Sequence, residues 1–261
     1  MDLPGEKALA EVAKDRAKDI YEDGLKPAVR EISKSLGTVF GLVNALLYPL
    51  EELRRDSSYK HQHFIDEVQE RAKAIPEDKL VTPPLHVSGP AFDGLRYVMD
   101  VKELREMYIA FLMCAMNSDT SDDVHPSFAE VIRQLSSDEA KILKALPPYG
   151  LYEPLLDVDV LIPGKSGRMT HYSNASVIGR EAQCKNPKNT PIYIDNLCRL
   201  GLTAMPECSV VDEARYDKIY VSEEYMRIIE GIPKAYKIET SRKCFGLTGY
   251  GARFRKVCMG E

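Results

Sequence analysis

The segment 118–128, "SDTSDDVHPSF", gathers the side chains of this chain that are best suited to chemistry. It places Asp119, Asp122, Asp123 and His125 within seven positions. Carboxylates and an imidazole at close spacing are ligands that a hard or borderline metal ion takes in proteins. A complete site would also need ligands from elsewhere in the chain, and no spacing indicates them.

The same segment also fits a turn between two helices. An apolar helical pattern precedes it, and Pro126 fits the first helical position of the next helix. The proline forces His125 into an extended backbone at the cap. Asp and Ser in such a connector bond to nearby backbone groups without any ion. We therefore predict a turn with helix caps and no metal, and keep a zinc or manganese enzyme here as the last alternative.

Sequence signatures of enzymes are absent. The chain has no Walker A loop, no GxGxxG after a strand, no HExxH and no GxSxG. Its six cysteines form no CxxC pair and no zinc spacing. We predict no catalytic residue, no metal and no cofactor, and the sequence favours a protein that is not an enzyme.

Charge is distributed unevenly along the chain. The formal net charge is −5 at pH 7. Residues 234–256 carry seven basic side chains against one acid, Glu239, so this segment is +6 and the remainder is −11. A basic segment on an acidic body can contact phosphate locally, although it is more often a solvated face.

One apolar segment invites a membrane interpretation. Residues 36–50, "LGTVFGLVNALLYPL", carry no charged side chain, but they are shorter than the roughly 20 residues needed to cross a bilayer. A buried core helix is the favoured prediction. In the alternative, the membrane contacts are Phe40, Leu42, Leu46 and Leu47. No secretory signal opens the chain, so we expect a cytoplasmic location.

The first half predicts helices joined by short connectors. Residues 101–117 are apolar nearly all round from Tyr108 to Met116, so this helix is expected in the centre of the core. Ser136 and Glu139 form a capping box for a helix in the run "SDEAKILKAL". Residues 75–92 contain four prolines and predict an extended connector. Pro90 fits the first turn of a short helix that is expected to run to about Val98.

The second half predicts a change of layer near 147–165. Strand-like pieces lie near 155–162, followed mostly by loop. Helices are expected over 190–200, over 221–232 and from Thr248 onward. Short β-prone runs between Ala235 and Leu247 flank "TSRK" and predict a hairpin.

Several of these runs resemble one protein family. The "LREMY" helix, the "MNSDT" turn, the run "HPSFAEVIRQL" and the following "LSSDEAKIL" are similar to the core of the bacterial Abi-alpha (abortive infection alpha) family. Upstream, "YEDGLKPAVREISKSLGTVFGLVNALLYPL" and "LVTPPLHVSGPA" are similar to the family's start. Downstream, "DNLCRLGL" and "LTGYGARFRKVC" resemble its closing segments, so the resemblance covers about 15–258. It implies a helix-rich bacterial protein associated with phage resistance, without assigned catalytic residues.

The C-terminal end also resembles a winged-helix domain. In that interpretation, helix 190–200 is the recognition helix and the hairpin near Thr240–Lys243 is the wing. Winged-helix units also serve in protein interaction and dimerisation.

The winged-helix resemblance implies a set of nucleic-acid contacts. Lys188, Lys243 and Arg253 would contact phosphates, and Asn196 or Arg199 would contact base edges.

The predicted fold is mainly α with a small β element. We expect a helical N-terminal domain over 1–125 and a winged-helix-like α+β domain over 126–261.

The predicted function is phage defence through binding an unknown protein partner, of phage or host, rather than through catalysis. Two alternatives stay open: a winged-helix nucleic-acid-binding regulator, and a membrane-acting toxin that uses residues 36–50. Oligomer formation is also left open.

Overall fold

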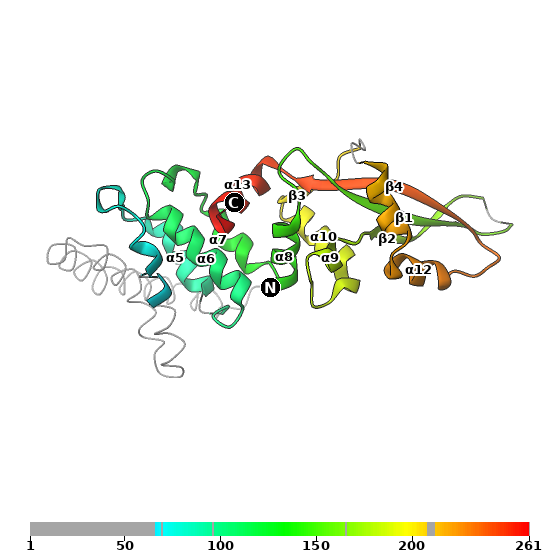
Figure 1. Ribbon diagram of the computed structural model, residues 1–261, viewed down its shortest axis with the longest axis horizontal. Helices are drawn as coiled ribbons and strands as arrows, with labels where there is room; N and C mark the ends of the chain where they lie inside the picture. The colour runs from blue at the N-terminus through cyan, green and yellow to red at the C-terminus, as the bar shows by residue number, and fades with distance from the viewer. Residues whose placement is uncertain (1–65, 69, 96, 165, 208–211, 261) are drawn as a thin grey trace, which may run out of the picture.

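The structure is a computed structural model that describes residues 66–68, 70–95, 97–164, 166–207 and 212–260. It has a helical part and a sheet part, and the sheet extends away from the helices (Figure 1). The helical part contains α5 (Leu85–Leu95), α6 (Lys102–Ala115), α7 (Ser127–Arg133), α8 (Ser137–Ala145) and α13 (Gly249–Met259). The sheet part contains β1 (Glu153–Leu161), β2 (Met169–Ala175), β3 (Thr203–Ala204), β4 (Lys237–Leu247), α9 (Ile178–Glu181), α10 (Thr190–Arg199), α11 (Glu213–Tyr220) and α12 (Glu223–Glu230). The described ranges also contain the short 3-10 turns η2 (Glu77–Lys79), η3 (Ser121–Asp123) and η4 (Pro187–Asn189).

The central helix of the helical part is α6. Tyr108, Ile109, Phe111 and Leu112 on it are 1% exposed or less. A helix that is apolar nearly all round needs neighbours on every side, and α5, α7, α8 and α13 pack against it. The predicted place of this helix in the centre of the core is confirmed.

Two predicted helix starts are confirmed by their caps. The Ser136 hydroxyl accepts from the Glu139 N–H, and the Glu139 carboxylate accepts from the Ser136 N–H at 2.6 Å. This capping box opens α8. The Thr248 hydroxyl accepts from the Gly251 N–H at 2.9 Å and opens α13.

The prediction for α5 was wrong at its start. This helix begins at Leu85 and contains Pro90, so residues 85–90 are not an extended connector. The carbonyl of Pro84 accepts from the Val87 N–H and begins the first turn. Pro90 removes only the one N–H that would reach the carbonyl four residues earlier, and the buried residues around it retain the helix.

The sheet is antiparallel in the order β2-β1-β4-β3. The two central strands pair over their full common length, from Glu153 opposite Phe245 to Leu161 opposite Lys237. The second strand, β2, adds an irregular outer ladder on the other side of β1, and β3 pairs only with the end of β4. The strand β4 leads directly to α13, so it joins the sheet part to the helical part (Figure 1).

The two faces of the sheet differ in polarity. Leu156, Val158 and Val160 of β1 are fully buried on one face, under α11 and α12. The alternate residue Asp159 is 2% exposed and accepts hydrogen bonds from Thr170 at 2.8 Å and Ser241 at 3.0 Å. The period-2 alternation of a strand therefore buries an apolar layer on one side and a bonded polar layer on the other.

The predicted mainly α fold class is wrong, because a four-stranded antiparallel sheet makes the protein an α+β mixture. The predicted wing is also wrong, since Thr240–Lys243 lies inside the single eleven-residue strand β4. The polar run looked like a turn, but its side chains have partners on the polar face of the sheet: Ser241 bonds Asp159, and Lys243 bonds Asp157. This removes the hairpin on which the winged-helix interpretation rested.

Several elements of the second half were not predicted, among them α9 and β3. The strand β2, "MTHYSNA", lies in a region expected to be loop, and α11 lies in a region with no predicted helix. The predicted division of the chain between residues 125 and 126 stays a prediction. One hydrophobic cluster takes in residues from α6 before that point and from α7, α8 and α13 after it.

Candidate functional site

A surface pocket of about 440 Å³ lies between α9, the loop that leads into η4, and α12. Its volume falls within the range of small-ligand pockets. We call it the basic pocket, because four of its lining side chains are cationic and one is anionic. It is lined by Tyr172, Arg180, Lys185, Asn186, Pro187, Lys188, Glu224, Arg227 and Ile228.

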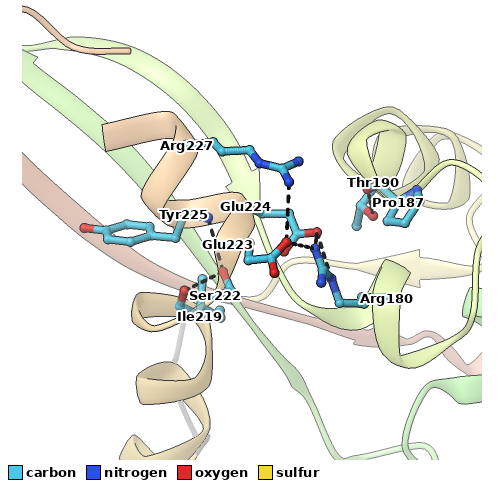
Figure 2. Close-up of polar contacts among 9 residues, drawn as sticks. All are labelled: Arg180, Pro187, Thr190, Ile219, Ser222, Glu223, Glu224, Tyr225 and Arg227. Atoms are coloured by element: carbon cyan, nitrogen blue, oxygen red, sulfur yellow. Dashed lines mark hydrogen bonds and ion pairs between the residues drawn. The ribbon is translucent and has the colours of Figure 1, made fainter. Parts of the chain in front are cut away.

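The two arginines of the basic pocket are held by two neighbouring carboxylates. Figure 2 shows Arg180 reaching from its helix toward Glu223 and Glu224 on α12. Its guanidinium bonds Glu224 at 2.6 and 3.0 Å and Glu223 at 3.1 Å. Arg227, one turn along α12, bonds Glu223 at 3.4 Å. The Arg180 pairs therefore join α9 to α12, whereas the Arg227 pair lies within α12.

The loop that carries Lys185 is anchored by Asp138 at the start of α8. This carboxylate is 5% exposed and accepts from the backbone N–H groups of Lys185 at 2.7 Å and Asn186 at 2.9 Å. It also accepts from the Tyr193 hydroxyl at 3.0 Å. Burial alone would raise the pKa of Asp138, but these hydrogen bonds outweigh burial and hold it below its usual value.

The start of α10 lies close against α9 and fixes the rest of the loop. The Thr190 hydroxyl donates to the Pro187 carbonyl at 2.5 Å (Figure 2). A Cβ on Gly179 would lie 1.9 Å from that hydroxyl, so only glycine permits this approach. Both contacts set the position of η4, and with it the position of Lys188.

Two cations of the basic pocket remain uncompensated. Within the described part of the chain, neither the Lys185 nor the Lys188 ammonium group has a carboxylate within ion-pair distance. Both side chains belong to exposed residues. The charges of Arg180 and Arg227 are matched by Glu223 and Glu224. Counted together, the pocket and its two carboxylates carry a surplus of two positive charges.

The remaining wall of the basic pocket is largely apolar. Ile228 lies on α12, and Tyr172 comes from β2; both pack partly against the hydrophobic clusters under the sheet. Burial raises the pKa of Tyr172, and the carboxylate of Glu224 adds to this effect, so the phenol stays neutral at ordinary pH. The pocket therefore combines cationic groups with an apolar surface that can contact the carbon atoms of a bound molecule.

Of the five predicted nucleic-acid contacts, only Lys188 lines the basic pocket. Asn196 donates to the Gln134 carbonyl at 3.2 Å and to the Glu139 carboxylate at 2.7 Å. Arg199 donates to Asn196 at 2.7 Å and to the Gln134 side chain at 3.1 Å. Both predicted base-edge readers are thus bonded to α8 and the residues before it.

Lys243 belongs to a bonded cluster on the polar face of the sheet. Its ammonium donates to Asp157 at 3.1 Å and to Asn174 at 2.9 Å. The amide of Asn174, a residue with a φ of 59°, also donates to Asp195 at 3.0 Å. Arg253, on α13, lies 3.5 Å from Asp123. The structure does not gather these predicted phosphate contacts into one site.

The acidic segment 119–125 forms a turn, as predicted, and this turn contains η3. The helix α7 begins one residue later than expected: its N-cap is Pro126, whose side chain makes no capping hydrogen bond. Asp119 pairs with Lys79, and Asp123 pairs with Lys256. The ring nitrogen Nδ1 of His125 accepts from the Ser127 N–H at 3.2 Å, at the start of α7. Among the described residues, no group of three or more His, Cys, Asp or Glu side chains is placed to hold a metal ion.

The predicted membrane contacts Phe40, Leu42, Leu46 and Leu47 lie outside the described residues. Within the described ranges, no helix has the length and apolar character to cross a membrane.

Sequence reasoning found Lys188 but missed Arg180, Lys185 and Arg227. A local signal for two of them existed, because "REAQCKNPK" at 180–188 carries three basic side chains against one acid. Arg227 comes from a helix more than forty positions later, and only the fold brings it to the same pocket.

The model of a protein family described as abortive infection alpha matches residues 58–258, which is 201 of the 261 residues. No match was found among curated proteins or among solved structures.

Proposed function

Because the chain belongs to the abortive infection alpha family, we propose that it acts in defence against phage by binding a partner at the basic pocket. The observation that supports this most is the charge of that pocket. Lys185 and Lys188 line it without carboxylate partners among the described residues, while carboxylates on α12 compensate the two arginines. An anionic group of a partner would supply the missing charge.

The proposed partner is a protein of phage or host that presents an acidic segment. Besides its cations, the basic pocket is lined by the apolar side chain of Ile228 and the ring of Tyr172. An apolar contact flanked by cations suits a protein surface better than a nucleic-acid backbone, which offers phosphates and base edges.

A nucleic-acid-binding regulator remains the alternative. It has less support, because Asn196, Arg199 and Lys243 already bond neighbouring groups. It would be favoured if the protein shifted duplex DNA in a gel and if Lys243→Ala together with Arg253→Ala removed the shift.

Phage plating tests the proposed function. We expect the double variant Lys185→Glu, Lys188→Glu to lose protection in cells that express the protein, because reversed charges repel an acidic partner. Both side chains are exposed, so circular dichroism and the melting temperature should stay close to those of the unchanged protein.

The matched control reverses two other exposed lysines. Lys102 and Lys237 have side chains 74% and 73% exposed and do not line the basic pocket. The variant Lys102→Glu, Lys237→Glu should keep protection. Full protection by the pocket variant, at equal protein level, would contradict the proposed function.

A further inference from the structure

We propose that the anionic group bound by the basic pocket is a phosphate monoester in its doubly charged form. The inference rests on the proposed function for the place of binding and adds the chemistry of the bound group. The favoured source is a phosphorylated side chain of the partner protein. A mononucleotide carries the same group and is distinguished by the experiment below.

The charge balance of the basic pocket carries the inference. Arg180 and Arg227 are offset by Glu223 and Glu224, which leaves the two positive charges of Lys185 and Lys188. A phosphate monoester carries about −1.5 to −2 at neutral pH, whereas a carboxylate carries a single negative charge. The phosphate dianion therefore neutralises the surplus positive charge of the pocket, whereas a carboxylate neutralises only half of it.

The kinds of donor present also favour phosphate. Phosphate has three oxygens that accept hydrogen bonds, and Arg clusters with Lys are the usual means of binding it in proteins. Arg227 is held only by a 3.4 Å contact to Glu223 and its side chain is 74% exposed. Its guanidinium is thus able to turn from that carboxylate to an incoming phosphate oxygen.

The shape of the basic pocket agrees with a phosphate on an organic group. Its volume of about 440 Å³ leaves space beyond a phosphate for the atoms that carry it. Tyr172 and Ile228 supply the apolar wall against which those atoms would pack.

Calorimetric titration of the full chain tests the inference with three probes. These are a short phosphoserine peptide, the same peptide with glutamate in place of phosphoserine, and adenosine 5′-monophosphate. We expect at least tenfold tighter binding of the phosphoserine peptide than of the glutamate peptide. The double variant Lys185→Gln, Lys188→Gln should lose at least tenfold in affinity for the phosphopeptide, and Lys102→Gln, Lys237→Gln should lose none.

A pH series provides a second measurement. The second pKa of a phosphate monoester is about 6, so binding should weaken between pH 7.5 and pH 5.5. The charged groups around it are Arg180, Lys185, Lys188, Arg227, Glu223 and Glu224, and the lining contains no histidine that would strengthen binding over the same range.

The outcomes separate the two proposals. Equal affinity for the phosphoserine and glutamate peptides, or affinity unchanged in the lysine variant, would overturn the inference. Tighter binding of adenosine monophosphate than of the phosphopeptide supports the phosphate site and assigns it to a nucleotide. Phosphate binding together with full phage protection by the pocket variant would remove the proposed function and leave the inference standing.

Discussion

At the scale of single residues, Asp138 fixes the loop that carries Lys185 and thereby the shape of the basic pocket. One buried carboxylate accepts two backbone N–H groups of the loop and one phenol. Hydrogen bonds to a charged group contribute more than neutral ones, at about 1.5–3 kcal/mol each. No other described side chain bonds both of these backbone groups, so the loop depends on this carboxylate.

We expect Asp138→Asn to lower the free energy of unfolding by about 2 kcal/mol, because the amide keeps the shape but loses the charge. The pKa of Asp138 in the folded protein lies below the ordinary value of 3.8. Its stabilising contribution is therefore present above about pH 4 and is lost as pH falls through the lower folded value.

Urea unfolding at pH 7 and at pH 3 measures both effects. The variant should lose less stability on acidification than the unchanged protein. Asp78→Asn, at an exposed position on η2, serves as control and should change neither value by more than about 0.5 kcal/mol. A variant as stable as the unchanged protein at pH 7 would contradict the role given to Asp138.

Single residues also show the limits of prediction from sequence. Ser136 with Glu139 and the Thr248 cap were predicted correctly, because a capping interaction spans three positions and depends on little else. The basic pocket was not predicted, because it is assembled from residues far apart in the sequence. Which of its cations are paired depends on the carboxylates of α12. Lys188 was singled out for its charge, but as a phosphate contact of a winged-helix domain.

At the scale of elements, α12 is the most weakly held wall of the basic pocket. None of its residues is fully buried, and its apolar side chains pack only partly against the clusters under the sheet. Its first turn depends on Ser222, whose hydroxyl accepts from the Tyr225 N–H at 3.2 Å. A short helix with few buried contacts opens locally more readily than the core.

We expect Ser222→Ala to destabilise α12 by about 1 kcal/mol through loss of its cap. Hydrogen exchange of the amides at 223–230 should become faster, while exchange in α6 stays unchanged. The phosphopeptide affinity should fall as well, because Arg227 and Glu224 lose their fixed place. Unchanged exchange in α12 would show that the cap is unimportant.

The strand β4 shows why the fold class was misjudged. Its central residues are polar, and a polar run between β-prone segments usually indicates a turn. Here the partners are Asp159 and Asp157 on the neighbouring strand, 82 and 86 positions away in the sequence, and a local pattern cannot indicate such pairing. β2 was missed because five of its seven residues are not buried, so its sequence lacks the apolar pattern of a strand.

At the scale of the whole molecule, α13 ties the helical part together. Phe254 is fully buried and meets the ring of Phe128 edge to face at 5.3 Å. We expect Phe254→Ala to lower the free energy of unfolding by about 3–5 kcal/mol, through lost burial and the cavity left behind.

Thermal unfolding measures the effect of Phe254→Ala, with Met226→Ala as an apolar control at a 51% exposed position. The control should change the free energy of unfolding by less than about 0.5 kcal/mol. A loss of only that size in Phe254→Ala would show that the core around α6 does not depend on α13.

The pairing of β1 with β4 also sets the time at which a newly made chain becomes folded. Glu153 pairs with Phe245, which follows it by 92 positions (245 − 153), and α13 lies beyond that strand. Synthesis proceeds at about 5–20 residues per second. The apolar surfaces of α6 and β1 therefore leave the ribosome several seconds before the segments that cover them. During that interval the nascent chain is open to chaperones and proteases, and the interval closes only when α13 has been made.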